Sequence, residues 1–306
     1  MKEAKLWQIS VTTSAEAEEA LAALLEREFK QKASIYVAHD SVQPTVTVYA
    51  SKLPGSALSA KAALALELNQ LARFGLETSP GVISIKRVAR EDWTRSWKKY
   101  FKVLEVGRAL LIKPSWSKRR PRKGEALVVL DPGLSFGTGQ HPTTAFCLRQ
   151  LVACRKNGQR QSFLDIGTGS GILAIAAARL GYAPVKAFDA DPVAVRVANA
   201  NAKRNRVADG VRIARADLRK LSCRGSAQFD LICANLLSDV LVRESERIFN
   251  RLRVCGHLVA AGILASEFPQ VRKAYEAIGL RLLVSEVEGG WKSGTFTKPA
   301  PDRHPG

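Results

Sequence analysis

A glycine-rich turn is the part of the sequence whose residues and spacing could bind a nucleotide-like ligand. Residues 163–166 form a short apolar run that predicts a strand. Three alternating glycines follow, Gly167, Gly169 and Gly171, and they permit a sharp turn with a close approach of the backbone to a ligand. The alanine-rich segment 172–180 then predicts a helix. This order of strand, turn and helix is typical of nucleotide-binding units.

The spacing of the glycines favours S-adenosylmethionine over a dinucleotide. Dinucleotide sites use G-x-G-x-x-G, whereas this turn reads G-x-G-x-G, with Ile172 where the third glycine would fall. S-adenosylmethionine has no pyrophosphate to place at a helix N-terminus, and its sulfonium charge suits a nearby carboxylate such as Asp165. The next strand ends at Asp189, where an acid can accept hydrogen bonds from a ribose. A tight turn in an α/β domain without this ligand is the alternative.

Polar residues follow four of the predicted strands. They are Asp165, Asp189, Asp217 and Asn235. In an open α/β sheet the ligand lies beyond the carboxyl ends of the strands, so we expect these residues to line one pocket. Asp189 would accept the ribose hydroxyls, Asp217 the adenine amino group, and Asn235 would face the methyl group that is transferred.

The turn-rich segment 131–144 is either a plain connection or a cover over this pocket. Its glycines could act as hinges. Phe136 could cover the adenosine or methionine part of the donor, and Thr138 and Thr144 are further candidate contacts to it. His141 is a candidate general base, but a His-Pro pair also suits the start of a helix. We therefore favour the structural role and assign no catalytic base.

The elements around these residues predict an α/β protein with two domains. Residues 1–90 alternate as β-α-β-β-α-β, the order of a ferredoxin-like domain. Residues 91–107 form an aromatic-rich linker. Residues 108–298 predict a doubly wound, mostly parallel sheet, because strands and helices alternate from residue 162 onward. The proline-rich tail 299–306 is expected to be disordered.

The chain is strongly basic, with 47 Lys and Arg against 28 Asp and Glu and a formal net charge of +19. Such a balance favours a polyanionic environment, most simply RNA. The densest cluster is Lys118, Arg119, Arg120, Arg122 and Lys123. It is either a loop that contacts ribosomal RNA or a solvated basic turn.

Composition argues against several other classes of protein. No apolar run approaches the length of a membrane span, and the first residues lack the apolar core of a secretory signal. The 5 cysteines form no C-x-x-C pair, so neither a disulfide framework nor a metal site is indicated. We expect a cytoplasmic protein with buried free thiols.

Six motifs occur in an order that resembles one family. They are Glu-Asp-Trp at 91–93, Lys-Pro-Ser-Trp at 113–116, Asp-Pro-Gly-Leu-Ser-Phe-Gly-Thr-Gly-Gln-His-Pro-Thr-Thr at 131–144, Asp-Ile-Gly-Thr-Gly-Ser-Gly-Ile-Leu-Ala-Ile-Ala-Ala at 165–177, Asp-Ala-Asp-Pro at 189–192 and Ala-Asn-Leu-Leu at 234–237. Together they are similar to the PrmA family, the methyltransferases of the eleventh protein of the large ribosomal subunit. The resemblance covers nearly the whole chain, although Thr168 stands where many members have cysteine.

The resemblance implies a class I methyltransferase domain with a seven-stranded sheet, preceded by a small domain that recognises the protein substrate. The positions that bind the methyl donor in this family correspond to Thr144, Gly167, Asp189 and Asn235 in this chain. The implied reaction is in-line transfer of a methyl group from S-adenosylmethionine to a neutral lysine ε-amine or an N-terminal α-amine, without a metal. Desolvation of that amine would assist the loss of its proton.

Two other functions remain open from the residues alone. A ribosomal RNA methyltransferase would suit the charge. However, enzymes that methylate planar nitrogens usually carry Asn/Asp-Pro-Pro-aromatic after the fourth strand, and Asn235-Leu236-Leu237-Ser238 has no ring to stack on a base. A noncatalytic ribosome-binding module is the third reading, and the intact glycine turn with Asp189 argues against it.

Overall fold

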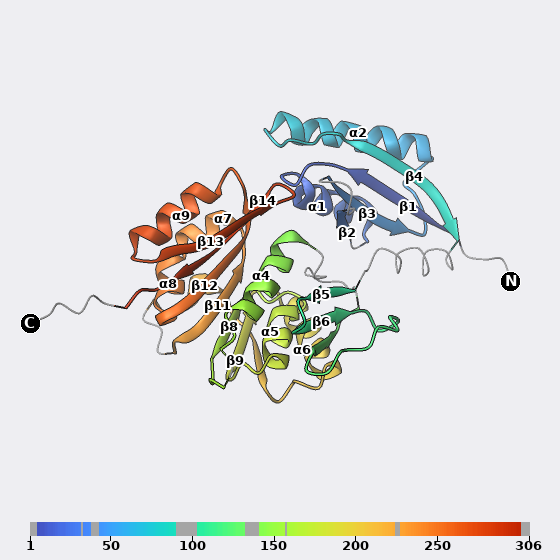
Figure 1. The fold of residues 1–306 in the computed structure, drawn as a ribbon. Helices are drawn as coiled ribbons and strands as arrows, with labels where there is room; N and C mark the ends of the chain where they lie inside the picture. Colours follow the sequence, from blue (N-terminus) through green and yellow to red (C-terminus); the bar gives the residue numbers. More distant parts are fainter. Residues whose placement is uncertain are drawn as a thin grey trace, which may run out of the picture. The chain divides into compact units, whose positions relative to one another are not determined.

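The computed structural model divides the chain into two compact units, Met1–Tyr100 and Phe101–Gly306 (Figure 1). The residues that it describes are 5–31, 33–37, 43–89, 103–131, 141–156, 158–223 and 227–300. Each unit has its own hydrophobic core. Among the described residues, no helix is long and apolar enough to cross a membrane.

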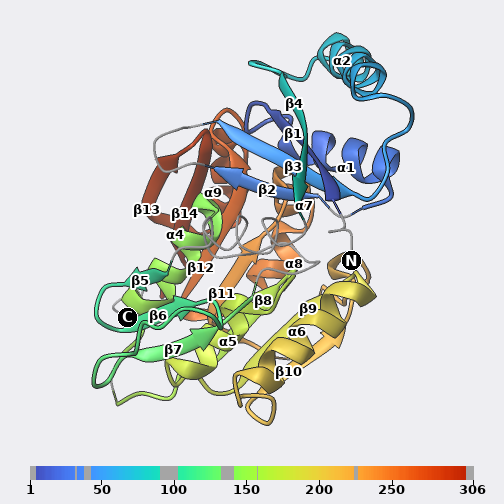
Figure 2. The same cartoon turned by 90° about the vertical axis from the view of Figure 1, so that its right-hand side faces the viewer.

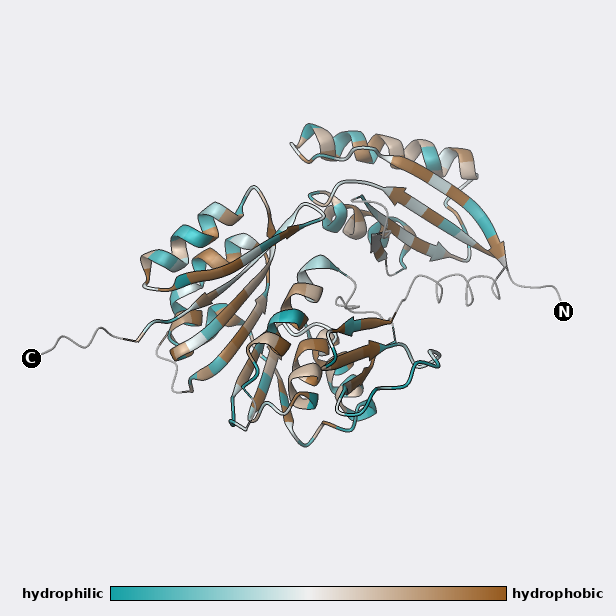
Figure 3. Cartoon of the chain, in the orientation of Figure 1, coloured by the Kyte–Doolittle hydropathy of each residue, from teal (hydrophilic) through white to brown (hydrophobic). Residues whose placement is uncertain are grey.

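The N-terminal unit is a four-stranded antiparallel sheet with two helices. Its elements are β1 (Lys5–Thr12), α1 (Glu18–Phe29), β2 (Ser34–Val37), β3 (Pro44–Ala50), α2 (Ala57–Arg73) and β4 (Val82–Ala89). The strand order is β2-β3-β1-β4, the arrangement expected of a ferredoxin-like domain. Apolar and polar residues alternate along the strands (Figure 3), so that one face, including Ile9 and Val48, packs on Leu21 and Leu64 of the helices.

The second unit begins with a small three-stranded sheet and one long helix. These elements are β5 (Leu104–Val106), β6 (Leu110–Lys113), β7 (Ala126–Val129) and α4 (Pro142–Ala153). Strand β5 falls inside the range 91–107 that the sequence suggested for a linker, but it pairs with β6 within the second unit. The end of that range therefore belongs to the folded unit; residues 90–102 lie outside the described residues.

The remaining elements build the main sheet and the helices on its two faces. They are β8 (Phe163–Ile166), α5 (Ile172–Arg179), β9 (Val185–Asp189), α6 (Pro192–Arg204), β10 (Val211–Arg215), the 3-10 helix η1 (Leu218–Lys220), β11 (Phe229–Asn235), α7 (Ser238–Arg243), α8 (Ser245–Phe249), β12 (Leu252–Leu264), α9 (Phe268–Ala277), β13 (Arg281–Glu288) and β14 (Trp291–Thr297).

The seven strands lie in the order β10-β9-β8-β11-β12-β14-β13 (Figure 2). The first five are parallel, whereas β14 runs antiparallel to both β12 and β13. One core cluster contains residues of α4, α5 and α6, and another contains residues of α7, α8 and α9. The doubly wound, mostly parallel seven-stranded sheet is thus confirmed.

The cysteines depart in part from expectation. Cys147 and Cys233 are buried free thiols, but Cys223 and Cys255 are exposed. Exposure of Cys223 follows from its place after η1, where the chain leaves the sheet edge.

Candidate active site

The topology of the sheet brings the four polar strand ends together. Asp165, Asp189 and Asn235 lie at the carboxyl ends of β8, β9 and β11, and Asp217 follows β10. These strands are consecutive neighbours in the sheet and all are parallel, so their carboxyl ends share one edge. The order along the chain reverses between β8 and β11, which is where open α/β sheets bind ligands.

The glycine turn adopts backbone conformations that favour glycine. The φ angles of Gly167, Gly169 and Gly171 are 72°, 54° and 82°. A Cβ on Gly167 would lie 2.6 Å from Leu236 Cδ2, just after β11, and one on Gly171 would lie 3.0 Å from the Ala198 Cβ of α6. The turn is therefore held tightly against both neighbours, which explains the alternate glycines.

Asp189 ties the glycine turn to the end of β9. Its Oδ2 accepts a hydrogen bond of 2.9 Å from the Gly169 backbone N–H, and its Oδ1 accepts one of 2.9 Å from the Asp191 N–H. A carboxylate has about four acceptor positions, so this side chain can still bind ligand hydroxyls. Asp189 thus shapes the turn and remains able to accept a hydrogen bond.

Asp165 is buried beneath the turn. Its Oδ2 accepts a hydrogen bond of 2.6 Å from Thr168 Oγ1. Burial raises the pKa of this carboxyl to about 7, and the neighbouring charge of Asp189 also raises it, against the lowering effect of the Thr168 and Ala174 hydrogen bonds. A buried carboxyl in this state gains stability from any cationic ligand placed beside it.

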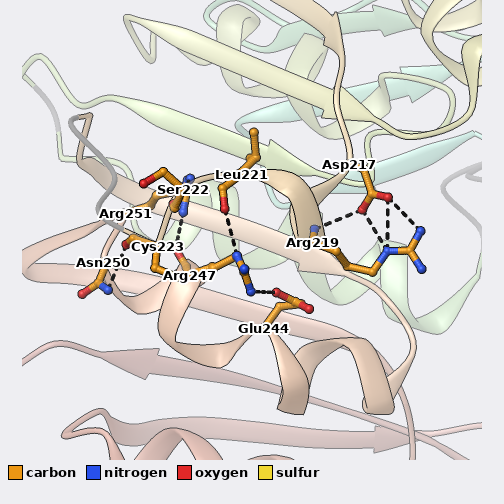
Figure 4. A network of polar contacts seen from close by, with 9 residues as sticks. All are labelled: Asp217, Arg219, Leu221, Ser222, Cys223, Glu244, Arg247, Asn250 and Arg251. Carbon is orange, nitrogen blue, oxygen red and sulfur yellow. Dashed lines mark hydrogen bonds and ion pairs between the residues drawn. The ribbon is translucent and has the colours of Figure 1, made fainter.

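Asp217 is engaged by a neighbouring arginine. The Arg219 guanidinium donates to both carboxylate oxygens, with Nη2 2.8 Å from Oδ2 and Nε 3.0 Å from Oδ1 (Figure 4). These hydrogen bonds lower the pKa of Asp217 to about 2. We did not predict the Asp217–Arg219 pair from the sequence. An incoming adenine amino group would have to share the Asp217 carboxylate with Arg219.

The segment after η1 is fixed to the α8 region by carbonyl hydrogen bonds (Figure 4). Arg247 Nε donates to the Leu221 oxygen at 2.9 Å, and Arg251 Nη2 to the Ser222 oxygen at 2.8 Å. Burial lowers the pKa of Arg251, and the charge of Arg247 lowers it further. These contacts hold the chain that follows Asp217.

Asn235 and Thr144 meet on the other side of the glycine turn. Asn235 Nδ2 lies 3.5 Å from Thr144 Oγ1, near the start of α4. Gly262 of β12 is packed against the same strand end: its φ is 80°, and a Cβ there would lie 2.9 Å from Asn235 Oδ1 and 2.7 Å from the Leu236 carbonyl oxygen. We did not single out Gly262 from the sequence, although a glycine inside a strand is a signal of close backbone approach.

His141 has the contacts of a helix start. It precedes α4, where Pro142 occupies the first turn, and its Nδ1 lies 2.7 Å from Thr143 Oγ1. Its ring meets the Trp291 ring edge-on, with 5.2 Å between centroids. These contacts favour the structural role over the general base.

The other candidates are placed as follows. Phe136 and Thr138 lie outside the described residues. In the basic cluster, Arg119 bonds Glu105 at 2.7 Å and Glu125 at 3.3 Å, and Arg122 bonds Glu105 at 3.3 Å. Within the part of the chain that the structure describes, no group of three or more His, Cys, Asp or Glu side chains could hold a metal ion.

Comparisons with known proteins agree with this geometry. The family model of ribosomal protein L11 methyltransferase (PrmA) matches residues 5–299. The ribosomal protein L11 methyltransferase of Chloroflexus aurantiacus is 40% identical over 240 residues, covering 72% of this chain and 73% of that protein. The one from Pelotomaculum thermopropionicum is 40% identical over 227 residues, covering 73% and 72%.

A solved structure has a similar fold over about two thirds of this chain. The ribosomal protein L11 methylase of Lactobacillus delbrueckii subsp. bulgaricus superimposes with a TM-score of 0.57 at 28% identity. The match covers 65% of this chain and 99% of that structure.

Proposed function

Because the chain belongs to the ribosomal protein L11 methyltransferase (PrmA) family, we propose that it transfers methyl groups from S-adenosylmethionine to ribosomal protein L11. It is an S-adenosylmethionine-dependent protein methyltransferase. The acceptors we propose are lysine ε-amines, the N-terminal α-amine, or both. The observation that carries the donor part of the proposal is the hydrogen bond from the Gly169 N–H to Asp189, which joins the glycine turn to the carboxylate that we assign to the ribose.

The residues of the pocket fit this donor. S-adenosylmethionine supplies an electrophilic methyl group on a sulfonium centre. Asp189 keeps free acceptor positions for the ribose hydroxyls, and the glycine turn, which carries no side chains at 167, 169 and 171, permits a close approach of the donor. Asp165 provides a buried carboxyl that a nearby positive charge would favour in its ionised form.

Asn235 and Thr144 stand on the side of the pocket that we assign to the methyl group. The close packing of the Gly262 backbone on Asn235 limits the movement of the Asn235 side chain on the β12 side. The contact with Thr144 limits it on the α4 side. Because methyl transfer needs the amine in line with the bond that breaks, rigid placement of these side chains contributes through orientation. We assign no catalytic base, and we propose that the loss of water around the amine on binding favours its neutral form.

The partner, the location and the metal requirement of the enzyme are also proposals. We propose that the N-terminal unit recognises the protein substrate. We also propose that the enzyme acts in the cytoplasm and that the reaction needs no metal. Of the basic cluster 118–123, Arg119 and Arg122 are already paired with acids, so we propose that any contact with ribosomal RNA there is made by Lys118, Arg120 and Lys123.

Transfer of a labelled methyl group tests the proposal directly. Purified ribosomal protein L11 and protein-free ribosomal RNA are offered separately, and label is expected on the protein. Asp189→Ala should lose transfer. Asp191→Asn should keep it, because the Asp191 side chain caps α6 by accepting a hydrogen bond from the Val193 N–H, and the substitution keeps the backbone N–H that donates to Asp189. Label on RNA alone would overturn the protein substrate, and equal activity of Asp189→Ala would overturn the assigned pocket.

A further inference from the structure

The positive charge is unevenly divided between the two units. Residues 101–306 contain 33 Lys and Arg against 17 Asp and Glu, whereas residues 1–100 contain 14 against 11. Within the second unit, residues 192–223 contain eight Lys and Arg against two Asp and Glu. This stretch covers α6, β10 and η1, at the edge of the main sheet. A large part of the excess charge is therefore concentrated on one corner of the fold.

Most of these charges form no ion pair within the described part of the chain. Arg204 pairs with Asp131 and Arg219 with Asp217. The other six are exposed and form no ion pair with any residue that the structure describes. They are Arg196, Lys203, Arg206, Arg212, Arg215 and Lys220. We call these six residues the α6–β10 surface. By contrast, acids neutralise two of the five charges in the 118–123 cluster.

The six residues lie on adjoining elements. Arg196 and Lys203 are seven positions apart on α6 and so share one side of the helix. Arg206 follows the end of α6, and Arg212 belongs to β10, which packs beside α6 at the sheet edge (Figure 2). Uncompensated positive charges on adjoining elements make the potential around this edge strand positive, and such a potential attracts a polyanion.

The surroundings of the charges indicate the class of partner. None of the large hydrophobic side chains that are exposed in the described residues lies in 192–223; they include Leu58, Leu66, Phe74 and Val287. An anionic membrane or a protein hot spot would use such anchors. Residues 192–223 also contain no Phe, Trp or Tyr, so they offer no ring on which an unpaired base could stack.

We propose that the α6–β10 surface binds the phosphate backbone of double-helical RNA, independently of sequence. Phosphate contacts from Lys and Arg need neither apolar anchors nor aromatic rings. The choice of RNA rests on the proposed ribosomal substrate, whereas the location of the surface rests on the charges alone. Binding at Lys203, Arg206 and Arg212, which lie away from the carboxyl ends of the strands, would bring the enzyme to ribosomal RNA without using the methyl-transfer pocket.

Two matched variants of the full-length enzyme test the proposal. The first is Lys203→Gln with Arg206→Gln and Arg212→Gln, all near the end of β10 that lies away from the pocket. The second removes the same number of charges from the basic cluster, by Lys118→Gln, Arg120→Gln and Lys123→Gln. Affinity for a fluorescent RNA duplex is measured over a range of salt concentrations.

The first variant should weaken binding by about tenfold or more in 0.1 M salt and should reduce the slope of log K against log salt by roughly two to three. The second should weaken binding less than about threefold. Equal or larger loss in the second variant would overturn the assigned surface, as would failure of the unchanged enzyme to bind the duplex.

Further binding measurements distinguish double-helical RNA from other anionic partners. Stronger binding to a single-stranded RNA, or equal binding to vesicles of anionic phospholipid, would overturn the choice of partner. Arg206→Lys with Arg212→Lys keeps the charge and should keep binding, which controls for misfolding. Methyl transfer to free ribosomal protein L11 should be unchanged in all variants, so that failure of RNA binding is distinguished from failure of the proposed activity.

Discussion

Replacing Gly262 with alanine is the sharpest test of how the site is positioned. A Cβ at this position would lie 2.7 Å from the Leu236 carbonyl oxygen, 2.9 Å from Asn235 Oδ1 and 3.0 Å from the Leu236 nitrogen. Two of these three atoms belong to the backbone. The Leu236 N–H also donates a 3.0 Å hydrogen bond to the Ala261 oxygen, so the clash cannot be relieved by rotating a side chain.

Two costs add in this variant. Alanine at a φ of 80° is strained by about 1–3 kcal/mol, and crowding of a packed interior costs about 1–3 kcal/mol more. We therefore expect the free energy of unfolding to fall by about 2–6 kcal/mol. Any relaxation must move Leu236 and Asn235, so methyl transfer should also fall at temperatures where the variant is folded.

Gly256→Ala is the matched control. It lies on the same strand, and its Cβ would be 2.8 Å from the Arg253 oxygen and 3.1 Å from the Asp230 oxygen, but at the opposite edge of the sheet. Urea unfolding and labelled methyl transfer are measured for both variants. Both should lose stability, and only Gly262→Ala should lose transfer by more than its unfolded fraction explains. Equal transfer by the two variants would refute the positioning role.

Three other results are expected. Asp189→Asn should weaken binding of S-adenosylmethionine by about 1–3 kcal/mol in calorimetry, because a charged acceptor is lost, while unchanged affinity would show that Asp189 does not contact the donor. The contribution of Asp165 to the unfolding free energy should fall by about 1.4 kcal/mol per pH unit as pH rises from about 4 to 7, because this carboxyl keeps its proton in the folded state up to a pKa of about 7. That slope should be missing from the pH profile of Asp165→Asn, and an unchanged profile would contradict the assignment. Trp291→Leu should lower both melting temperature and methyl transfer, since the edge-on contact between the His141 and Trp291 rings is lost, whereas Trp291→Phe should restore much of each.

The strand ends of the site could be predicted from the sequence because two general rules apply to them. Apolar runs locate the buried strands, and parallel strands place their carboxyl ends at one edge. Asp165, Asp189 and Asn235 were found in this way, and the sheet order confirms that their strands are neighbours.

The contacts between distant residues could not be predicted in the same way. The pairing of Arg119 with Glu105 depends on how β5, β6 and β7 are arranged, and no periodicity reports that arrangement. The packing of Gly262 on Asn235 likewise depends on the register of β12 against β11. The Arg219 pair is local, but an arginine two residues after an aspartate does not by itself indicate which of its neighbours it binds.

The reversed strand β14 has a consequence for synthesis on the ribosome. In the described sheet β13 forms strand pairs only with β14, and β14 joins β13 to β12. β13 leaves the ribosome first and has no strand to pair with until residues 291–297 follow it. Trp291, the contact of His141 at the start of α4, arrives in the same segment. The nascent enzyme therefore completes its sheet, and gains the contact of Trp291 with His141 at the start of α4, only after residues 291–297 have been made.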